Sequence, residues 1–290
     1  MRIETATIEA YAAALPAAEV APPDPATELV AADHESRAAF FICLDAINFG
    51  SGWWPTIRKR PRHSGYFTIA AGLTERFQGA GPWPASVLRG LGPGDIAVAL
   101  GQDPEHPLMS DYAASLRDVG EHVLADYGGR FAAVLEAAGG SAVALADLLA
   151  GWEAFADAST YDERRVPFYK RAQIAAADLD RAGVANLREV DRLTAFADNL
   201  VPHVLRVDEV LVYDLELAAA IDAGELLAPG SPAETEIRAG GIHAVELLCA
   251  ELAATGRPTT PQALDYVLWF RGGAPAYKAV PRHRARSVFY

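Results

Sequence analysis

The chain has 290 residues, a formal net charge of −13 and 51% hydrophobic residues. This length suits one large domain or two closely packed ones, and ordinary charged and aromatic fractions exclude disordered, collagen-like and coiled-coil proteins. The acidic balance argues against a protein that follows a long nucleic-acid backbone, because such proteins need a continuous basic surface. It still allows one small anionic ligand in a local basic pocket.

Few residues are of the kinds that form disulfides or metal sites. The two cysteines, Cys43 and Cys249, have apolar neighbours, which predicts small buried thiols in a reducing compartment. The sequence contains no CxxC, HExxH or Cys/His cluster, so we expect no protein-held metal. It also has no secretory signal and no run of about 18 apolar residues. We therefore expect a cytoplasmic protein.

Apolar residues recur every three or four positions along most of the chain, which predicts a mostly α-helical fold with a few short strands. The best strand candidates are GYFTIA (65–70) and DIAVAL (95–100). Caps and prolines predict the helix boundaries. These are ends at Gly128–Gly129 and Gly139–Gly140, a start at Ser141, helices from Pro167 to Gly183 and from Pro232 to Gly256, and a start at Thr260–Pro261.

Residues 50–110 are rich in Gly and Pro and contain three of the five tryptophans. We expect ordered loops anchored by aromatic side chains there, because flexible linkers lack Trp. We expect residues 1–290 to form a single compact domain. A soft boundary near residue 150 separates a helical, loop-rich half (1–150) from a second half (151–290).

No general catalytic signature is present, since GxGxxG after a strand, GxxxxGK[ST] and GxSxG are all missing. Polar residues in apolar surroundings remain as candidates. Asp198 and Asn199 precede Pro202, so one of them caps a helix, or Asp198 is a fixed carboxylate facing a pocket. Lys170 shares a helical face with Gln173. It is either a solvated surface group or has a special role in a chain with only three lysines.

Asp265, Tyr266 and Trp269 fall on one face of a predicted helix. A carboxylate beside flat aromatic surface suits a planar heterocycle with N–H donors, but core packing explains both aromatic residues equally well. Asp45 and Asn48 also share a face.

Two basic runs, RKRPRH (58–63) and PRHRAR (281–286), are either solvated surface or a site for a phosphate. Spacing and composition alone therefore indicate a helical protein with a candidate pocket, and no reaction.

Six blocks along the chain carry a more specific signal. They are FFICLDAINFGSGWW, RVPFYKRAQIAAADL, LTAFADNLVPHVLR, ETEIRAGGIHAVELL, LDYVLWF and PRHRARSVFY. In this order they resemble the queuosine salvage protein family, the queuosine 5′-phosphate N-glycosylases, from about residue 34 to Tyr290. The resemblance implies hydrolysis of queuosine 5′-monophosphate to queuine and ribose 5-phosphate, without a metal or organic cofactor. It also implies a second half similar to helix-hairpin-helix DNA glycosylases. From the acidic charge and the lack of a long apolar run, we expect neither polymeric nucleic acid nor a membrane as partner.

The resemblance also implies roles for individual residues. Asp198 matches the family's catalytic carboxylate. Lys170 matches the lysine of its FYKRAQ motif and is the second expected catalytic residue. The substrate-binding positions are His34, Phe196, Asp265 and Tyr266. Phe270 is a departure, because relatives often have an acidic residue there. Another group then holds the amine or diol of queuine, or recognition at this point is looser.

These residue types fit the chemistry. Cleavage of a nucleoside C1′–N bond passes through an oxocarbenium-like state, which a fixed carboxylate at Asp198 stabilises, whether it attacks C1′ or activates water. A 7-deazapurine lacks N7, so hydrogen bonds must stabilise the departing base. Asp265 suits its N–H groups, Phe196 and Tyr266 suit its ring, and Lys170 or an arginine suits the phosphate.

Two alternatives stay open. One is a protein that binds queuine or another modified nucleobase without catalysis. The other is a glycosylase that acts on a nucleic-acid polymer, which the acidic charge disfavours.

Overall fold

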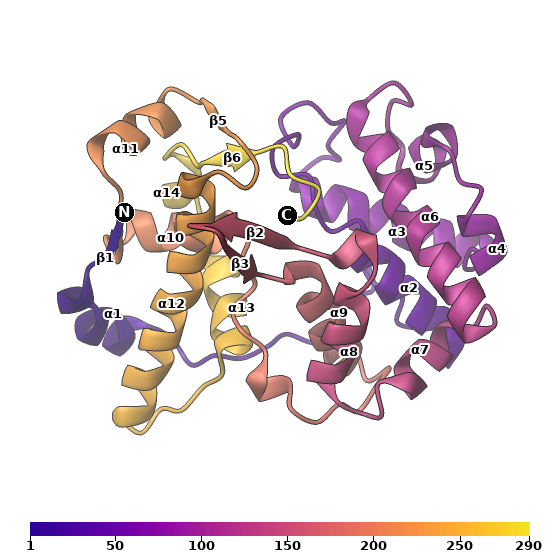
Figure 1. The fold of residues 1–290 in the computed structure, drawn as a ribbon, viewed down its shortest axis with the longest axis horizontal. Coiled ribbons are helices and arrows are strands. Elements are labelled where there is room, and N and C mark those ends of the chain that lie inside the picture. Colours follow the sequence, from indigo (N-terminus) through magenta and orange to yellow (C-terminus); the bar gives the residue numbers. More distant parts are fainter.

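The computed structural model describes residues 1–290 and confirms a mostly α-helical fold with a few short strands (Figure 1). The α-helices are α1 (Ile8–Ala14), α2 (His34–Ala46), α3 (Gly65–Ala80), α4 (Ala85–Leu88), α5 (Pro93–Leu100), α6 (Pro107–Tyr127), α7 (Phe131–Ala137), α8 (Ala142–Ala150), α9 (Lys170–Arg181), α10 (Leu200–Val207), α11 (Leu215–Asp222), α12 (Pro232–Ala254), α13 (Pro261–Arg271) and α14 (Pro275–Lys278). Short 3-10 helices are η1 (Thr5–Thr7), η2 (Glu153–Phe155) and η3 (Val190–Arg192).

The strands form three separate pairs and no larger sheet. They are β1 (Arg2–Ile3), β2 (Ala158–Tyr161), β3 (Arg164–Pro167), β4 (Leu211–Val212), β5 (Leu226–Leu227) and β6 (Arg284–Ala285). β1 pairs with β4 and β2 with β3 in antiparallel fashion, whereas β5 and β6 are parallel.

Side-chain caps explain where several helices begin. The hydroxyl groups of Ser141, Ser231 and Thr260 each accept a hydrogen bond from the backbone N–H three residues later, at the starts of α8, α12 and α13. These bonds satisfy N–H groups that have no partner within the helix. Gly128 ends α6 in the left-handed conformation, with φ +61°. The predicted starts of these three helices and the predicted end of α6 are confirmed.

The prediction of strands at 65–70 and 95–100 is wrong, because these residues lie in α3 and α5. The Ser64 hydroxyl accepts from Phe67 N at 3.2 Å and begins α3. In α5, Pro93 is the first residue and Asp95 accepts from Gly92 N at 2.8 Å. A six-residue apolar run does not distinguish a strand from a buried helix. The residues that begin α3 and α5 favour the helical conformation here.

The Gly- and Pro-rich region 50–110 therefore contains the three helices α3, α4 and α5 between its loops. Trp53 and Trp83 are buried in the core, as expected for aromatic anchors. The helix predicted from Pro167 begins three residues later, at Lys170. Pro167 pairs with Ala158 at the end of the β2–β3 hairpin, so it belongs to a strand.

The hydrophobic core divides into two clusters. The first is built from residues between Leu29 and Leu193, and the second from Ile8, Ala12 and Leu15 together with residues between Ala195 and Tyr277. α1 joins the second cluster by packing on α12. The division falls near residue 194, and the predicted soft boundary near 150 lies inside the first cluster. The single-domain organisation stays a prediction.

The parts of the chain that build the two clusters also contact each other. The β2–β3 hairpin reaches α12 (Figure 1), where the Tyr161 hydroxyl donates to Glu236 Oε1 at 2.6 Å. Trp269 of α13 packs edge-on against Tyr66 and Phe67 of α3, with ring centroids 5.8 and 5.6 Å apart. Both contacts fix the orientation of the two clusters around the middle of the molecule.

The C-terminal segment, residues 281–290, crosses between the two clusters (yellow in Figure 1). Its β6 pairs with β5, and Gly50 N donates to the Tyr290 carbonyl oxygen at 3.1 Å. A Cβ atom on Gly52 would lie 2.3 Å from the Ala285 carbonyl oxygen. This close approach requires glycine at position 52. The segment is therefore packed against the loop that follows α2.

No helix combines the length and the apolar character that crossing a membrane requires. Cys43 and Cys249 are both free and buried, so the prediction of small buried thiols is confirmed.

Candidate active site

Lys170, the first residue of α9, is buried with 5% of its surface exposed. Its Nζ donates to the Asn48 carbonyl oxygen at 2.8 Å and lies 3.5 Å from Asn48 Oδ1. Burial lowers the pKa of Lys170 to about 8, and the Asp198 carboxylate is the neighbouring charge that most opposes this shift. The structure therefore brings Lys170 and Asp198 into electrostatic contact.

The two carboxylate oxygens of Asp198 have different surroundings. Oδ1 accepts hydrogen bonds from Leu200 N at 2.8 Å and from Val201 N at 3.0 Å, at the start of α10. Oδ2 forms no hydrogen bond with the protein. Asp198 therefore caps the helix with one oxygen and keeps the other free. The two alternatives that the sequence left open, a cap and a carboxylate facing a ligand, are compatible in this geometry.

Asp265 of α13 is buried beside the loop that precedes α10 and contains Asp198. Its Oδ2 accepts from Phe196 N at 3.0 Å, two residues before Asp198. Burial raises the pKa of Asp265 well above its ordinary value, and the Asp198 carboxylate raises this pKa further. Two neighbouring carboxyl groups disfavour a double negative charge. Its Oδ1 has no hydrogen bond with the protein.

A cavity of about 380 Å³ lies next to Phe196. Its lining includes the side chains of Phe196 and Tyr266, Asp178 and Arg181 of α9, and residues 20–22. The volume is in the range of small-molecule sites. The structure thus brings two residues predicted to bind a base, Phe196 and Tyr266, to one cavity. A second cavity of about 390 Å³, at Arg206 and Tyr213, contains none of the predicted site residues.

His34 does not line this cavity. It is exposed at the first position of α2, where its Nε2 lies 2.9 Å from the Val184 carbonyl oxygen. Asn48, the partner of Lys170, follows the opposite end of α2. At 1.5 Å per residue, the ends of this helix are roughly 18 Å apart. A role for His34 in base binding stays a prediction.

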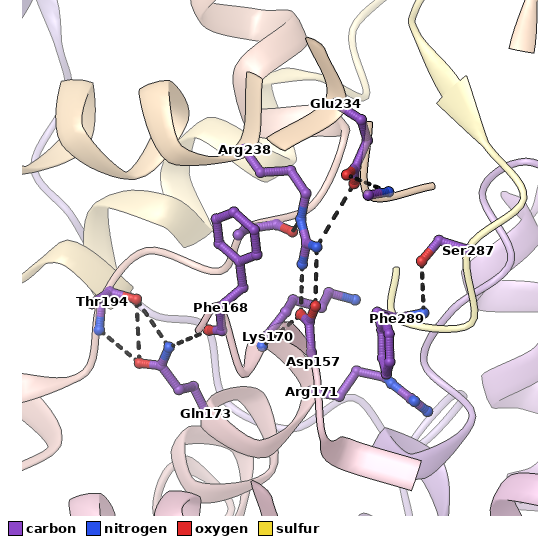
Figure 2. A network of polar contacts seen from close by, with 12 residues as sticks. Asp157, Phe168, Lys170, Arg171, Gln173, Thr194, Glu234, Arg238, Ser287 and Phe289 are labelled. Atoms are coloured by element: carbon purple, nitrogen blue, oxygen red, sulfur yellow. Dashed lines mark hydrogen bonds and ion pairs between the residues drawn. The ribbon is translucent and has the colours of Figure 1, made fainter. Parts of the chain in front are cut away.

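A buried ion pair links the segments that carry Lys170 and Asp198 (Figure 2). Arg238 Nη1 and Nη2 donate to the two carboxylate oxygens of Asp157 at 3.0 and 2.5 Å. Asp157 Oδ2 also accepts from Lys170 N at 3.1 Å, and Arg238 Nε donates to the Ala197 carbonyl oxygen at 2.9 Å. The pair therefore fixes the start of α9 relative to the residue before Asp198.

Gln173 holds the beginning of the same loop. Its Oε1 accepts from Thr194 N at 2.8 Å, and its Nε2 donates to the Phe168 carbonyl oxygen at 2.9 Å (Figure 2). The loop from Thr194 to Asp198 is thus bonded to Gln173 of α9 at one end and to Arg238 of α12 at the other. Such support keeps a carboxylate in one place.

Sequence reasoning did not select Asp157 or Arg238. Arg238 lies within the family block ETEIRAGGIHAVELL, where it is a charged residue in the largely apolar stretch IRAGGI. The pair Asp45 and Asn48 was found from their shared face, and Asn48 Nδ2 donates to Asp45 Oδ1 at 3.3 Å. No group of three or more His, Cys, Asp or Glu side chains is arranged to hold a metal ion.

A family model described as queuosine salvage protein matches residues 29–290 of the chain. The chain belongs to this family. The queuosine 5′-phosphate N-glycosylase/hydrolase of Sphaerobacter thermophilus is 35% identical to it over 99% of this chain and 92% of the relative. The protein of the same name from Dictyostelium discoideum is 30% identical, over 88% of this chain and 79% of the relative. The family resemblance stated from the sequence is confirmed.

The queuosine salvage family match begins at residue 29, yet the preceding residues take part in this fold. Ile8, Ala12 and Leu15 belong to the second core cluster, and residues 20–22 line the cavity beside Phe196. The N-terminal residues therefore contribute both to packing and to the candidate site.

Proposed function

We propose that this chain hydrolyses the N-glycosidic bond of queuosine 5′-phosphate and releases queuine and ribose 5-phosphate for queuine salvage. Family membership and the names of the two relatives support this activity. The structural observation that carries it is the Asp198 carboxylate, which has one oxygen fixed by α10 and one free, near a buried lysine. A fixed negative charge is the group that an oxocarbenium-like transition state requires.

In this reaction the C1′–N9 bond breaks and its electron pair leaves with the base. The oxygen of a water molecule bonds to C1′, and a proton reaches N9. Asp198 stabilises the positive charge that develops at C1′, either by electrostatics alone, by attack on C1′ or by activating the water. Its bonds to Leu200 and Val201 hold it in place before the substrate arrives, so little reorganisation is needed in the transition state.

The base is assigned to the cavity lined by Phe196 and Tyr266, whose rings offer flat apolar surface to a 7-deazapurine. Asp265, adjacent in sequence to Tyr266, keeps Oδ1 free for N–H groups of the base. Lys170 adds a positive charge near Asp198. We assign His34 to base binding on the family resemblance only. The net charge of −13 supports a small-molecule substrate in place of a nucleic-acid polymer. The free, buried thiols of Cys43 and Cys249 support a reducing compartment such as the cytoplasm.

The test of this activity is release of free queuine, followed by chromatography. Purified protein is incubated with queuosine 5′-phosphate and, separately, with queuosine, and the Asp198→Ala variant serves as the control. We expect rapid release by the wild-type protein and little by the variant. Tight binding of queuine without release from either compound would contradict the proposal and favour the non-catalytic binding protein.

The buried position of Lys170 predicts a dependence of activity on pH. Burial lowers its pKa from 10.5 to about 8, so the charge near Asp198 is lost as the pH rises through about 8. We expect kcat/KM for queuine release to fall above this pH. The exposed Lys59 provides a matched control, because Lys59→Met should leave the profile unchanged. A wild-type profile that stays flat to pH 9.5 contradicts this role.

The lowered pKa of Lys170 predicts that stability, unlike activity, increases with pH. Since the folded pKa lies below the unfolded value, the unfolded state binds more protons between about pH 8 and 10.5, and stability rises with pH in this window. Below pH 8 both states are protonated and the full cost of burying the charge remains. Denaturant melts of wild type and Lys170→Met should therefore diverge with pH above 8, and parallel pH dependences would contradict the assignment.

A further inference from the structure

Arg282 differs from the other arginines of the chain. It is half-buried, yet it forms neither a hydrogen bond nor an ion pair. Every other arginine that is withdrawn from solvent has at least one such partner, as Arg238 has Asp157 and Arg206 has Asp222. Arg62, Arg164 and Arg286 also lack partners, but they are exposed to solvent. A partly desolvated cation without a partner is costly, so its position indicates that an anion binds there.

The backbone around Arg282 is held firmly against α10. The Asn199 side chain donates to the His283 carbonyl oxygen at 3.0 Å, and Arg206 Nη1 donates to the Pro281 carbonyl oxygen at 3.3 Å. Asn199 and His283 are both buried. Residues on both sides of Arg282 are therefore bonded to residues at the two ends of the helix that Asp198 caps.

The charges around Arg282 agree with this placement. Burial lowers the pKa of Arg282, and the Asp198 carboxylate is the neighbouring group that opposes the shift. Asp198 and Arg282 therefore lie within electrostatic reach of each other. A ribose 5-phosphate unit that places C1′ at Asp198 carries its phosphate on the same sugar. That dianion needs a cation close to Asp198, both to bind it and to screen it from the carboxylate.

We propose that the Arg282 guanidinium binds the 5′-phosphate of the substrate and sets the preference for the phosphorylated over the free nucleoside. The inference rests on the proposed function and names the group that recognises the phosphate. A guanidinium suits this role because its N–H groups match two phosphate oxygens at once.

The other nearby cations each have a hydrogen-bond or ion-pair partner within the protein. Lys170 Nζ donates to the Asn48 carbonyl oxygen at 2.8 Å. Arg206 is bonded to Asp222 at 3.0 Å, and Arg284 Nη2 donates to the Gly224 carbonyl oxygen at 3.3 Å. Arg282 thus differs from these three cations because none of its side-chain donors has a partner within the protein.

The test compares Arg282→Met with Arg286→Met, which removes an exposed arginine from the same segment. Queuine release is measured from queuosine 5′-phosphate and from queuosine, and thermal melts establish that both variants are folded. Loss of a charge-assisted hydrogen bond predicts about a 10- to 100-fold lower kcat/KM for the phosphate in Arg282→Met, mainly through KM. We expect less than about a threefold change for the nucleoside, and no change for either compound in Arg286→Met. Equal losses on both compounds, or no loss on the phosphate, would overturn the proposal.

A second measurement separates this inference from the proposed function. Ribose 5-phosphate is titrated into wild type, Arg282→Met and Arg286→Met, and binding is followed by calorimetry without any turnover. We expect binding to wild type and Arg286→Met, and at least about tenfold weaker binding to Arg282→Met. If no queuine is released but this difference is found, the phosphate site stands and the hydrolase activity fails. Equal affinity of all three proteins overturns the phosphate site alone.

Discussion

Replacement of Asp198 by Asn is expected to lower kcat for queuine release by about 10²- to 10³-fold, the cost of removing one preorganised electrostatic group. The amide oxygen of Asn accepts the same hydrogen bonds from Leu200 and Val201 that Asp198 Oδ1 accepts. The substitution therefore removes the negative charge and leaves the cap in place. Single-turnover release of queuine from the 5′-phosphate, together with a thermal melt, measures both effects.

Asp214→Asn is the matched control. Asp214 caps α11 by accepting from Leu217 N at 2.9 Å, and no predicted site residue contacts it. Because Asn and Asp are about equally good caps, both variants should melt close to wild type, and only Asp198→Asn should lose turnover. Near-normal turnover in Asp198→Asn would reduce this residue to a helix cap.

The helix boundaries that the sequence predicts correctly depend on local interactions. Ser141 and Thr260 bond to N–H groups three residues away, so a short window contains all the information. The strands predicted at 65–70 and 95–100 failed for a related reason. Their apolar runs are too short to define a period. The helices are set by residues just outside these runs, the cap Ser64 and the first helical residue Pro93.

The division into two core clusters is not local and was not predicted. α1 packs on α12 at the other end of the chain, and no periodicity in either helix specifies its partner. Burial of an apolar face is satisfied by many surfaces, so the pairing depends on the whole chain. The family resemblance indicates the order of the blocks but does not state which helices meet.

The contacts within the candidate site were also not predictable from local sequence patterns. Lys170, Asp198 and Asp265 were candidates from the sequence, and the family resemblance gave them roles. The structure brings these three into electrostatic contact. The basic run 281–286 was recognised as a candidate phosphate site, but only the structure distinguishes Arg282 from Arg284, which is bonded to Gly224. Which arginine keeps free donors is a property of its neighbours in space.

Arg238→Met is expected to destabilise the fold by about 3–5 kcal/mol, because it leaves the buried Asp157 carboxylate without its partner. Asp157 and Arg238 are 81 positions apart and both buried. The loss should appear as a lower midpoint of urea denaturation. Arg271→Met is the control, since Arg271 pairs with Asp208 at 3.1 Å with 34% of its side chain exposed. Its loss should cost about 1 kcal/mol or less.

The double variant Asp157→Asn with Arg238→Met separates charge from packing. Removing the unpaired carboxylate should restore part of the stability lost in Arg238→Met. Activity should stay low in both, because neither variant holds the Ala197 carbonyl oxygen through Arg238 Nε, and the residue before Asp198 is released from α12. Measured at a temperature where all variants are folded, the expected result is a lower kcat with little change in KM. Full recovery of kcat in the double variant would mean that the ion pair stabilises the fold without positioning Asp198.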